Sequence, residues 1–125
     1  MHPTELLAQL AQFTGSETFT RHGLARSMLM SEGVKFLAVT AAAHWLTDAI
    51  ASYQHEARVH VEEFQVWKLA IDAKTRRATL TMVDGNSTTP IITQQIEYTD
   101  FPLEEIALWL VASGSHRVLM LPSEY

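Results

Sequence analysis

The chain contains no cysteine among its 125 residues. This absence excludes disulfides, thiolate catalysis and cysteine-ligated zinc, and it favours a cytoplasmic location. A metal would have to bind histidine or carboxylate side chains, but the histidines do not occur at tight metal-binding spacings such as HExxH. We therefore expect neither a metal nor any other cofactor.

Long hydrophobic runs are missing as well. The first residues, MHPTELLAQLAQF, lack a basic stretch, and polar side chains interrupt their apolar positions. They match neither a signal peptide nor a membrane anchor, so we expect no association with a membrane.

Basic residues are few. The formal charge is −5, from 14 acidic and 9 basic residues, and the cluster of Lys74, Arg76 and Arg77 falls in a predicted turn. We do not expect nucleic-acid binding, because neutralising phosphates requires several basic side chains on one face. A basic protein partner suits the negative charge better.

Sequence motifs that would indicate a particular reaction or ligand are also absent. The sequence has no glycine-rich phosphate loop, no GxSxG nucleophile elbow and no DxDxDG calcium loop. Hydrophobic residues make up 47% of the chain and charged residues 18%, as in an ordinary globular protein. We expect one domain that spans residues 1–125.

The most apolar stretch is Ser31–Gln54, which is rich in helix-forming residues. At about 100° per residue its apolar side chains cover more than half of a helix circumference, so we expect a sheet and another helix to pack against it. Ser31 is a suitable N-cap, and Glu32 places a negative charge in the first turn. The alanine run at 41–43 leaves open whether the stretch is one helix or two.

The segments on either side of this stretch are shorter. Thr4–Phe13 has apolar residues at helical spacing and predicts a short amphipathic helix. Residues 17–31 predict one or two short strands with an interruption near Gly23. The polar interval 55–63 fits a helix tail, a loop or an edge strand.

Three strands are predicted next, at Phe64–Ile71, Ala78–Val83 and Ile91–Tyr98. The first is apolar on both faces, as in the centre of a sheet, and the third alternates between apolar and polar residues. The turns DAKTRR and DGN separate them. We interpret the three strands as an antiparallel meander.

The remaining residues predict a helix and a last strand. Asp100 and Pro102 resemble a helix start, an apolar stripe follows at helical spacing, and Gly114 suits the helix end. Val118–Leu121 has the length and composition of a strand. The sequence thus predicts an α+β fold, in which a mostly antiparallel sheet, made of the meander plus flanking strands, packs on a central helix between an N-terminal and a C-terminal helix.

Four polar side chains are candidates for a catalytic or ligand-binding cleft: Arg21, His22, His44 and Asp48. His44 and Asp48 lie four residues apart on the predicted helix, so the carboxylate could fix the tautomer of a general base. Arg21 and His22 lie together just before Gly23. The alternative is a polar seam on a mostly buried helix, at its boundary with water.

A second candidate is an acidic corner between the third strand of the meander and the C-terminal helix. Its members are Glu97, Asp100, Glu104 and Glu105, together with Trp109 on the same predicted helix. Tryptophan is common in binding hot spots, and Trp109 lies beyond the main apolar stripe. We interpret the corner as a partner-binding surface, with a merely solvated face as the alternative.

Several stretches carry a family resemblance. They are FTGSETFTRHGL, SEGVKFLAVTAAAHWLTDAIASYQ, FQVWKLAID, DGNSTTP, IEYTDFPLEEI and VLMLPSEY. With its YTDFPL and LPSEY signatures, the chain resembles an uncharacterised family of small bacterial and mobile-element proteins, a domain of unknown function. SEG stands at 31–33 where TDG is more typical, and AHW at 43–45 where Tyr-Trp is, which argues against a catalytic His44.

The resemblance implies an accessory gene of a phage, plasmid or integrated element, where small acidic proteins often act by occupying a host protein. The first hypothesis is therefore a non-enzymatic protein-binding or regulatory protein, with inhibition of a host defence factor as one form of that role. One alternative is a small enzyme or ligand-binding protein that uses the cleft. Another is a self-associating structural subunit whose apolar surface is buried between copies.

Overall fold

Seven strands form one sheet in the computed structural model, which describes residues 2–23, 25 and 27–125. The strand order is β1-β2-β7-β6-β3-β4-β5, and each neighbouring pair is antiparallel except β2 with β7. The strands are β1 Thr20–Arg21, β2 Met28–Met30, β3 Phe64–Ile71, β4 Ala78–Val83, β5 Ile92–Ile96, β6 Glu105–Ser113 and β7 His116–Met120. The predicted α+β class with a mostly antiparallel sheet is confirmed.

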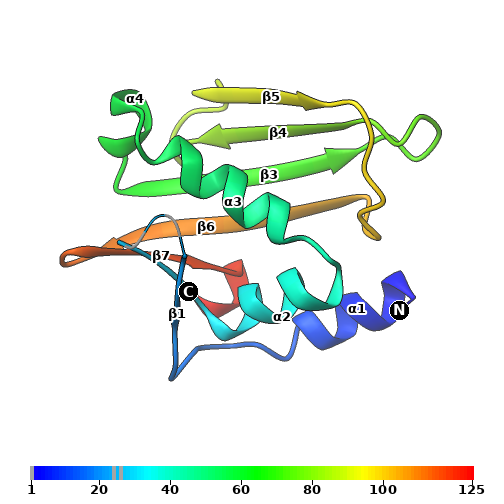
Figure 1. Ribbon diagram of the computed structural model, residues 1–125, viewed down its shortest axis with the longest axis horizontal. Helices are drawn as coiled ribbons and strands as arrows, with labels where there is room; N and C mark the ends of the chain where they lie inside the picture. The colour runs from blue at the N-terminus through cyan, green and yellow to red at the C-terminus, as the bar shows by residue number, and fades with distance from the viewer. Residues whose placement is uncertain (1, 24, 26) are drawn as a thin grey trace.

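Helix α3, His44–Tyr53, packs on one face of this sheet, where Tyr53 contacts Trp67. The other helices are α1 Pro3–Leu10, α2 Glu32–Thr40, α4 Ala57–His60 and the short 3-10 helix η1 Pro122–Glu124. Figure 1 shows α3 crossing in front of the central strands, with α2 and α1 below it. We call the face under α3 the inner face; it carries the fully buried Trp67 and Leu110. The opposite face is the outer face.

The stretch 31–54 forms two helices rather than one. The side-chain oxygen of Ser31 caps α2 by accepting a hydrogen bond from the amide of Val34 at 3.2 Å, as predicted. After α2, Ala42 adopts a φ of 51°, and the amides of residues 42 and 43 donate back to carbonyls of the last turn. This Schellman ending redirects the chain, so α3 begins at His44.

The segments around these helices follow the expected order. The N-terminal helix is confirmed as α1, and two short strands, β1 and β2, occupy the interval 17–31. Positions 24 and 26 of that interval, beside the predicted interruption at Gly23, lie outside the described residues. The undecided interval 55–63 contains the single-turn helix α4.

The strands β3 and β4 have their predicted bounds, and β5 lies within the predicted third strand. The turns before and after β4 each begin with an aspartate whose carboxylate accepts hydrogen bonds from backbone amides. The amides of Thr75 and Lys74 hold the pKa of Asp72 below its ordinary 3.8, and those of Asn86 and Ser87 do the same to the pKa of Asp84.

The predicted C-terminal helix is wrong, because residues 105–113 form β6. This strand pairs with β3 on one side and with β7 on the other. Leu108 and Leu110 face the core and are buried, whereas Trp109 and Val111 point to the outer face and are half-buried. Apolar side chains on both faces of the strand happened to match the spacing of a helix.

The residues that resembled the ends of that helix have other roles. Asp100 lies in the irregular connection from β5 to β6, and Gly114, with a φ of 60°, lies in the two-residue turn from β6 to β7. A tight hairpin turn requires such a positive φ, which glycine adopts at low cost. None of the described helices is long and apolar enough to cross a membrane.

Candidate functional site

The cleft candidates come together only in part. His22 lies just after β1, and its Nε2 is 2.8 Å from Oδ1 of Asp48 on α3. The imidazole is buried, at 4% exposure, while the carboxylate is 57% exposed. Arg21 and His44 are exposed residues of β1 and of the first turn of α3. The structure therefore pairs Asp48 with His22, whereas the sequence predicted a pair with His44.

The contacts of His22 fix the tautomer of its neutral ring. Its Nδ1 accepts a hydrogen bond from the amide of Ala25 at 3.0 Å, so in the neutral ring the proton lies on Nε2 and is donated to Asp48. Both ring nitrogens thus bind groups of the protein itself. The neighbouring cavity of about 170 Å³ is lined by His22, Ala25, Asp48, Ala51, Ser52 and His55. A general base needs a nitrogen facing its substrate, and His22 offers none.

The His22–Asp48 pair is expected to stabilise the fold. His22→Ala should lower the free energy of unfolding by about 1–3 kcal/mol, because the buried amide of Ala25 loses its acceptor. Asp48→Asn should cost less than about 1 kcal/mol, since the amide oxygen still accepts from Nε2. Urea unfolding followed by circular dichroism measures both. Equal losses in the two variants would contradict this account.

The proposed partner-binding residues are divided between two parts of the molecule. Glu97 and Asp100 are exposed in the connection between β5 and β6, and Glu104 directly precedes β6. Glu105 and Trp109 lie on the outer face, in register with Ala70 and Val66 of β3. The acidic corner therefore consists of Glu97, Asp100 and Glu104.

The acidic corner borders a shallow hollow of about 340 Å³. Trp45, Ile96, Tyr98, Thr99 and Asp100 line it. Trp45 comes from the first turn of α3 and is half-buried, while Tyr98 is 69% exposed. Two aromatic side chains and one carboxylate thus share a single concave surface. The sequence analysis did not select Tyr98, although Tyr98 lies between Glu97 and Asp100.

The side chain of Arg76 hydrogen-bonds to the backbone of the connection from β5 to β6. The guanidinium of Arg76 donates hydrogen bonds to the carbonyls of Thr99 at 3.1 Å and Phe101 at 2.6 Å. The amide of Thr99 donates to the carbonyl of Arg76 at 2.9 Å, and the ring of Phe101 is fully buried beside this anchor. Tyr98 and Asp100 flank an anchored residue, so the hollow is preorganised.

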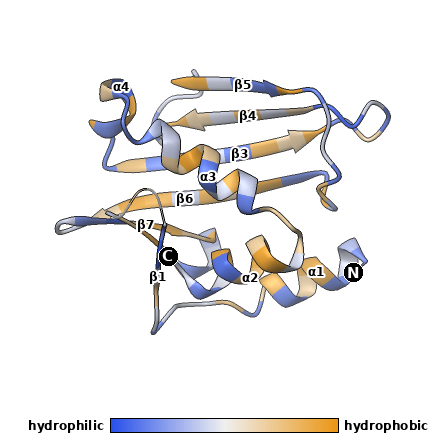
Figure 2. Ribbon diagram, in the orientation of Figure 1, coloured by the Kyte–Doolittle hydropathy of each residue, from blue (hydrophilic) through white to orange (hydrophobic). Residues whose placement is uncertain are grey.

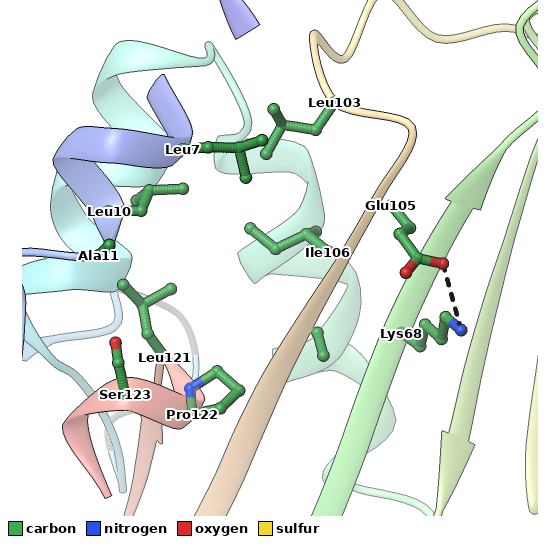
Figure 3. A pocket seen from close by; sticks show the side chains of 11 residues that line it. Leu7, Leu10, Ala11, Lys68, Leu103, Glu105, Ile106, Leu121, Pro122 and Ser123 are labelled. Atoms are coloured by element: carbon green, nitrogen blue, oxygen red, sulfur yellow. Dashed lines mark ion pairs between the residues drawn. The ribbon is translucent and has the colours of Figure 1, made fainter. Parts of the chain in front are cut away.

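A larger hollow of about 470 Å³ lies between α1 and β6 and is shown in Figure 3. In that view Leu7 and Leu10 extend from α1 toward β6, and Ile106 extends from β6 toward α1. Glu105 lies on the other side of the β6 ribbon in that view, 3.3 Å from Nζ of Lys68. Because both partners of this ion pair are more than half exposed, it contributes little stability. It does place Glu105 outside the acidic corner.

The segments SEG at 31–33 and LPSEY at 121–125 form one structural unit. The carboxylate of Glu124, in the LPSEY segment, accepts hydrogen bonds from the hydroxyls of Ser31 and Ser16 and from the amides of Gly33 and Leu121. It therefore caps the N-terminus of α2. Among the described residues, no group of three or more histidines and carboxylates is placed to hold a metal ion.

A family model described as "Family of unknown function (DUF6876)" matches residues 4–125. A solved structure described as "Crystal structure of the protein of unknown function from Enterococcus faecalis" is similar, with a TM-score of 0.58 and 17% identity over 86% of this chain and 98% of that chain. At this identity the likeness concerns the fold alone. No curated protein matches the sequence.

Proposed function

We propose that this chain, which belongs to the DUF6876 family of unknown function, is a non-enzymatic protein-binding protein that regulates a partner by occupying its surface. The observation that supports the proposal is the hollow formed by Trp45, Tyr98 and Asp100 at the acidic corner. We do not extend the proposal to catalysis, because both nitrogens of His22 are engaged within the protein.

The chemistry of the hollow selects a basic side chain. An arginine or lysine that enters it would place its charge near the carboxylate of Asp100 and over aromatic rings, which attract cations through their faces. Glu97 and Glu104, both exposed in the connection from β5 to β6, add to the negative charge of this connection, and the whole chain carries −5. These attractions would speed encounter with a basic partner and weaken as salt is added.

The resemblance to proteins of phages and mobile elements supplies the kind of partner. We propose a host protein with an exposed basic segment, and a component of antiviral defence is the case that the resemblance favours. In this proposal the protein inhibits by blocking that basic segment. Inhibition by occupancy needs no catalytic group, only a preorganised surface, and Arg76 supplies the rigidity.

A hexaarginine peptide tests the hollow directly. In ¹H–¹⁵N spectra at about 0.15 M salt, the indole signal of Trp45 is expected to shift on titration, while that of the buried Trp67 stays in place. Asp100→Asn should weaken binding about fivefold, because it removes about 1 kcal/mol of charge-assisted attraction.

Glu5→Gln is the matched control for this test. It removes the same charge from an exposed position on α1 and should change the affinity less than about twofold. Equal weakening by Asp100→Asn and Glu5→Gln would show that the peptide responds only to net charge, and the hollow would then lose its role. A shift of the Trp109 signal in place of Trp45 would have the same meaning.

A further inference from the structure

We propose that the outer face of the sheet joins two copies of this chain into a two-fold symmetric dimer. This inference goes beyond partner binding at the acidic corner, which lies on a different part of the molecule. It rests on three observations: an aromatic cluster with one exposed ring, apolar side chains at most outward positions of β3 and β6, and the lack of unpaired charge on the outward side of β3 to β6.

The aromatic cluster consists of Phe64, Trp109 and Tyr125. The centroid of Trp109 lies 5.3 Å from that of Phe64 and 5.3 Å from that of Tyr125, and the third pair is 5.9 Å apart, all edge to face. Tyr125 is 73% exposed. Three rings from β3, β6 and the residue after η1 therefore pack into one ordered cluster, in which Phe64 and Trp109 are half-buried and Tyr125 faces water.

Aliphatic side chains extend this surface. Val66 and Val111 lie beside the aromatic cluster, and Met120 pairs with Trp109 across β6 and β7. In Figure 2, β6 has hydrophobic colours over most of its length, although alternate residues point to opposite faces. An antiparallel sheet with one face in water normally alternates apolar and polar residues. The consecutive outward residues Ala107, Trp109 and Val111 of β6 depart from this alternation and favour a partner over this part of the face.

The outer face includes the charged Arg21 of β1, but strands β3 to β6 carry almost no charge on that face. By register, the outward positions of β3 to β6 are Phe64, Val66, Lys68, Ala70, Thr79, Thr81, Val83, Thr93, Gln95, Glu105, Ala107, Trp109, Val111 and Ser113. The two charged members, Lys68 and Glu105, are paired with each other at 3.3 Å. The −5 charge of the chain thus arises elsewhere.

This distribution of charge favours a second copy as the occupant. Two chains of charge −5 repel each other, and a neutral face is where two copies can meet with the least repulsion. A two-fold axis brings the same patch of each copy together, so a neutral apolar patch is complementary to itself. A basic partner gains nothing from this face and is drawn to the acidic corner. The two sheets would stack about 10 Å apart, with the aromatic clusters near the axis.

Sedimentation equilibrium over a range of concentrations tests the dimer. The unchanged protein is expected to approach twice the 14.0 kDa mass of one chain as concentration rises. Val66→Lys should weaken dimerisation at least tenfold, because it places two like charges near the two-fold axis. Val39→Lys, the same change at a 60% exposed position on α2, should leave the dimer intact.

A second variant tests the same surface in case Val66→Lys does not fold. Tyr125→Ser removes a ring that is already 73% exposed, so the fold should persist while dimerisation weakens severalfold. A mass of 14.0 kDa at every concentration, or equal effects of Val66→Lys and Val39→Lys, would overturn the proposal. The monomeric variants should still shift the Trp45 signal with hexaarginine, which separates this proposal from the function of the acidic corner.

Discussion

Gly33→Ala is expected to lower the free energy of unfolding by about 2–4 kcal/mol, although alanine favours helix formation over glycine by about 1 kcal/mol. A Cβ atom at this position of α2 would lie 2.6 Å from Oε1 of Glu124 and 2.6 Å from Cδ1 of Leu121. Both contacts are far below van der Waals separation. Something must therefore move, and the cost depends on how firmly these two side chains are held.

The side chain of Glu124 is held firmly. Its carboxylate accepts hydrogen bonds from the hydroxyls of Ser31 at 2.5 Å and Ser16 at 2.6 Å, and from the amides of Gly33 at 3.2 Å and Leu121 at 2.9 Å. Hydrogen bonds to a charged group contribute about 1.5–3 kcal/mol each, and not additively. Rotating the carboxylate away from a new methyl group sacrifices several of them and uncaps α2.

A double-mutant cycle checks this reasoning. Thermal and urea unfolding of Gly33→Ala, Glu124→Ala and the double variant should show that the two losses are strongly non-additive, because both act on the same carboxylate. Gly15→Ala is the control, since nothing lies within 4 Å of a Cβ built there. If Gly33→Ala were as stable as the unchanged chain, the gain in helix propensity would exceed the cost of displacing the Glu124 carboxylate. The hydrogen bonds of Glu124 would then contribute little to stability.

This cap also shows what one sequence reveals and what it hides. Ser31 was identified as an N-cap from its place before a helical stretch, because that signal is local. The carboxylate that completes the cap comes from a residue 93 positions further along the chain. Spacing within the sequence carries no information about such a contact. LPSEY is one of the signatures of the family resemblance and SEG is a departure from the family pattern, and in the structure the two segments form one unit.

The error at β6 has a different cause. Local pattern alone could not separate a helix from a strand there, because a strand between two others can be apolar on both faces. High β-propensity is found at Ile106, Trp109 and Val111, whereas Asp100 and Pro102 match the sequence signature of a helix start. Hydrogen bonding to β3 and β7 makes residues 105–113 a strand. Trp109 therefore lies on the outer face and not on a helix beside the acidic corner, and the residues of the predicted binding surface lie on two separate surfaces.

The buried polar core of the sheet was not anticipated at all. Gln65 belongs to a strand that was recognised as central, yet its side chain is fully buried. Its Oε1 accepts hydrogen bonds from the indole of Trp67 at 2.9 Å and from the amide of Gln54 at 2.9 Å. Its Nε2 donates to the side chain of Gln54 and to the carbonyls of Val59 and Glu62 at 3.0–3.1 Å. One amide thus connects β3 to the end of α3 and to α4.

Gln65→Leu is therefore expected to cost about 3–5 kcal/mol, in spite of the gain in hydrophobicity. Leucine leaves an indole N–H, a second amide and two carbonyls without their partner in a buried region, and each unsatisfied group costs about 1–3 kcal/mol before the structure relaxes. Gln12→Leu, the same change at an exposed position after α1, should alter stability by less than about 0.5 kcal/mol. Urea unfolding compares the two variants.

Hydrogen exchange distinguishes two possible causes of the stability lost in Gln65→Leu. If the amide network ties α4 to the sheet, Gln65→Leu should raise the exchange rate of the amides of residues 57–62 at least tenfold more than that of β4, because those residues lose their direct connection. If instead exchange rises equally throughout, the loss comes from packing of Trp67 alone. In that case α4 would be held by Val59, which is fully buried, and by the hydrogen bonds of Arg117 to the carbonyls of His60 and Glu62.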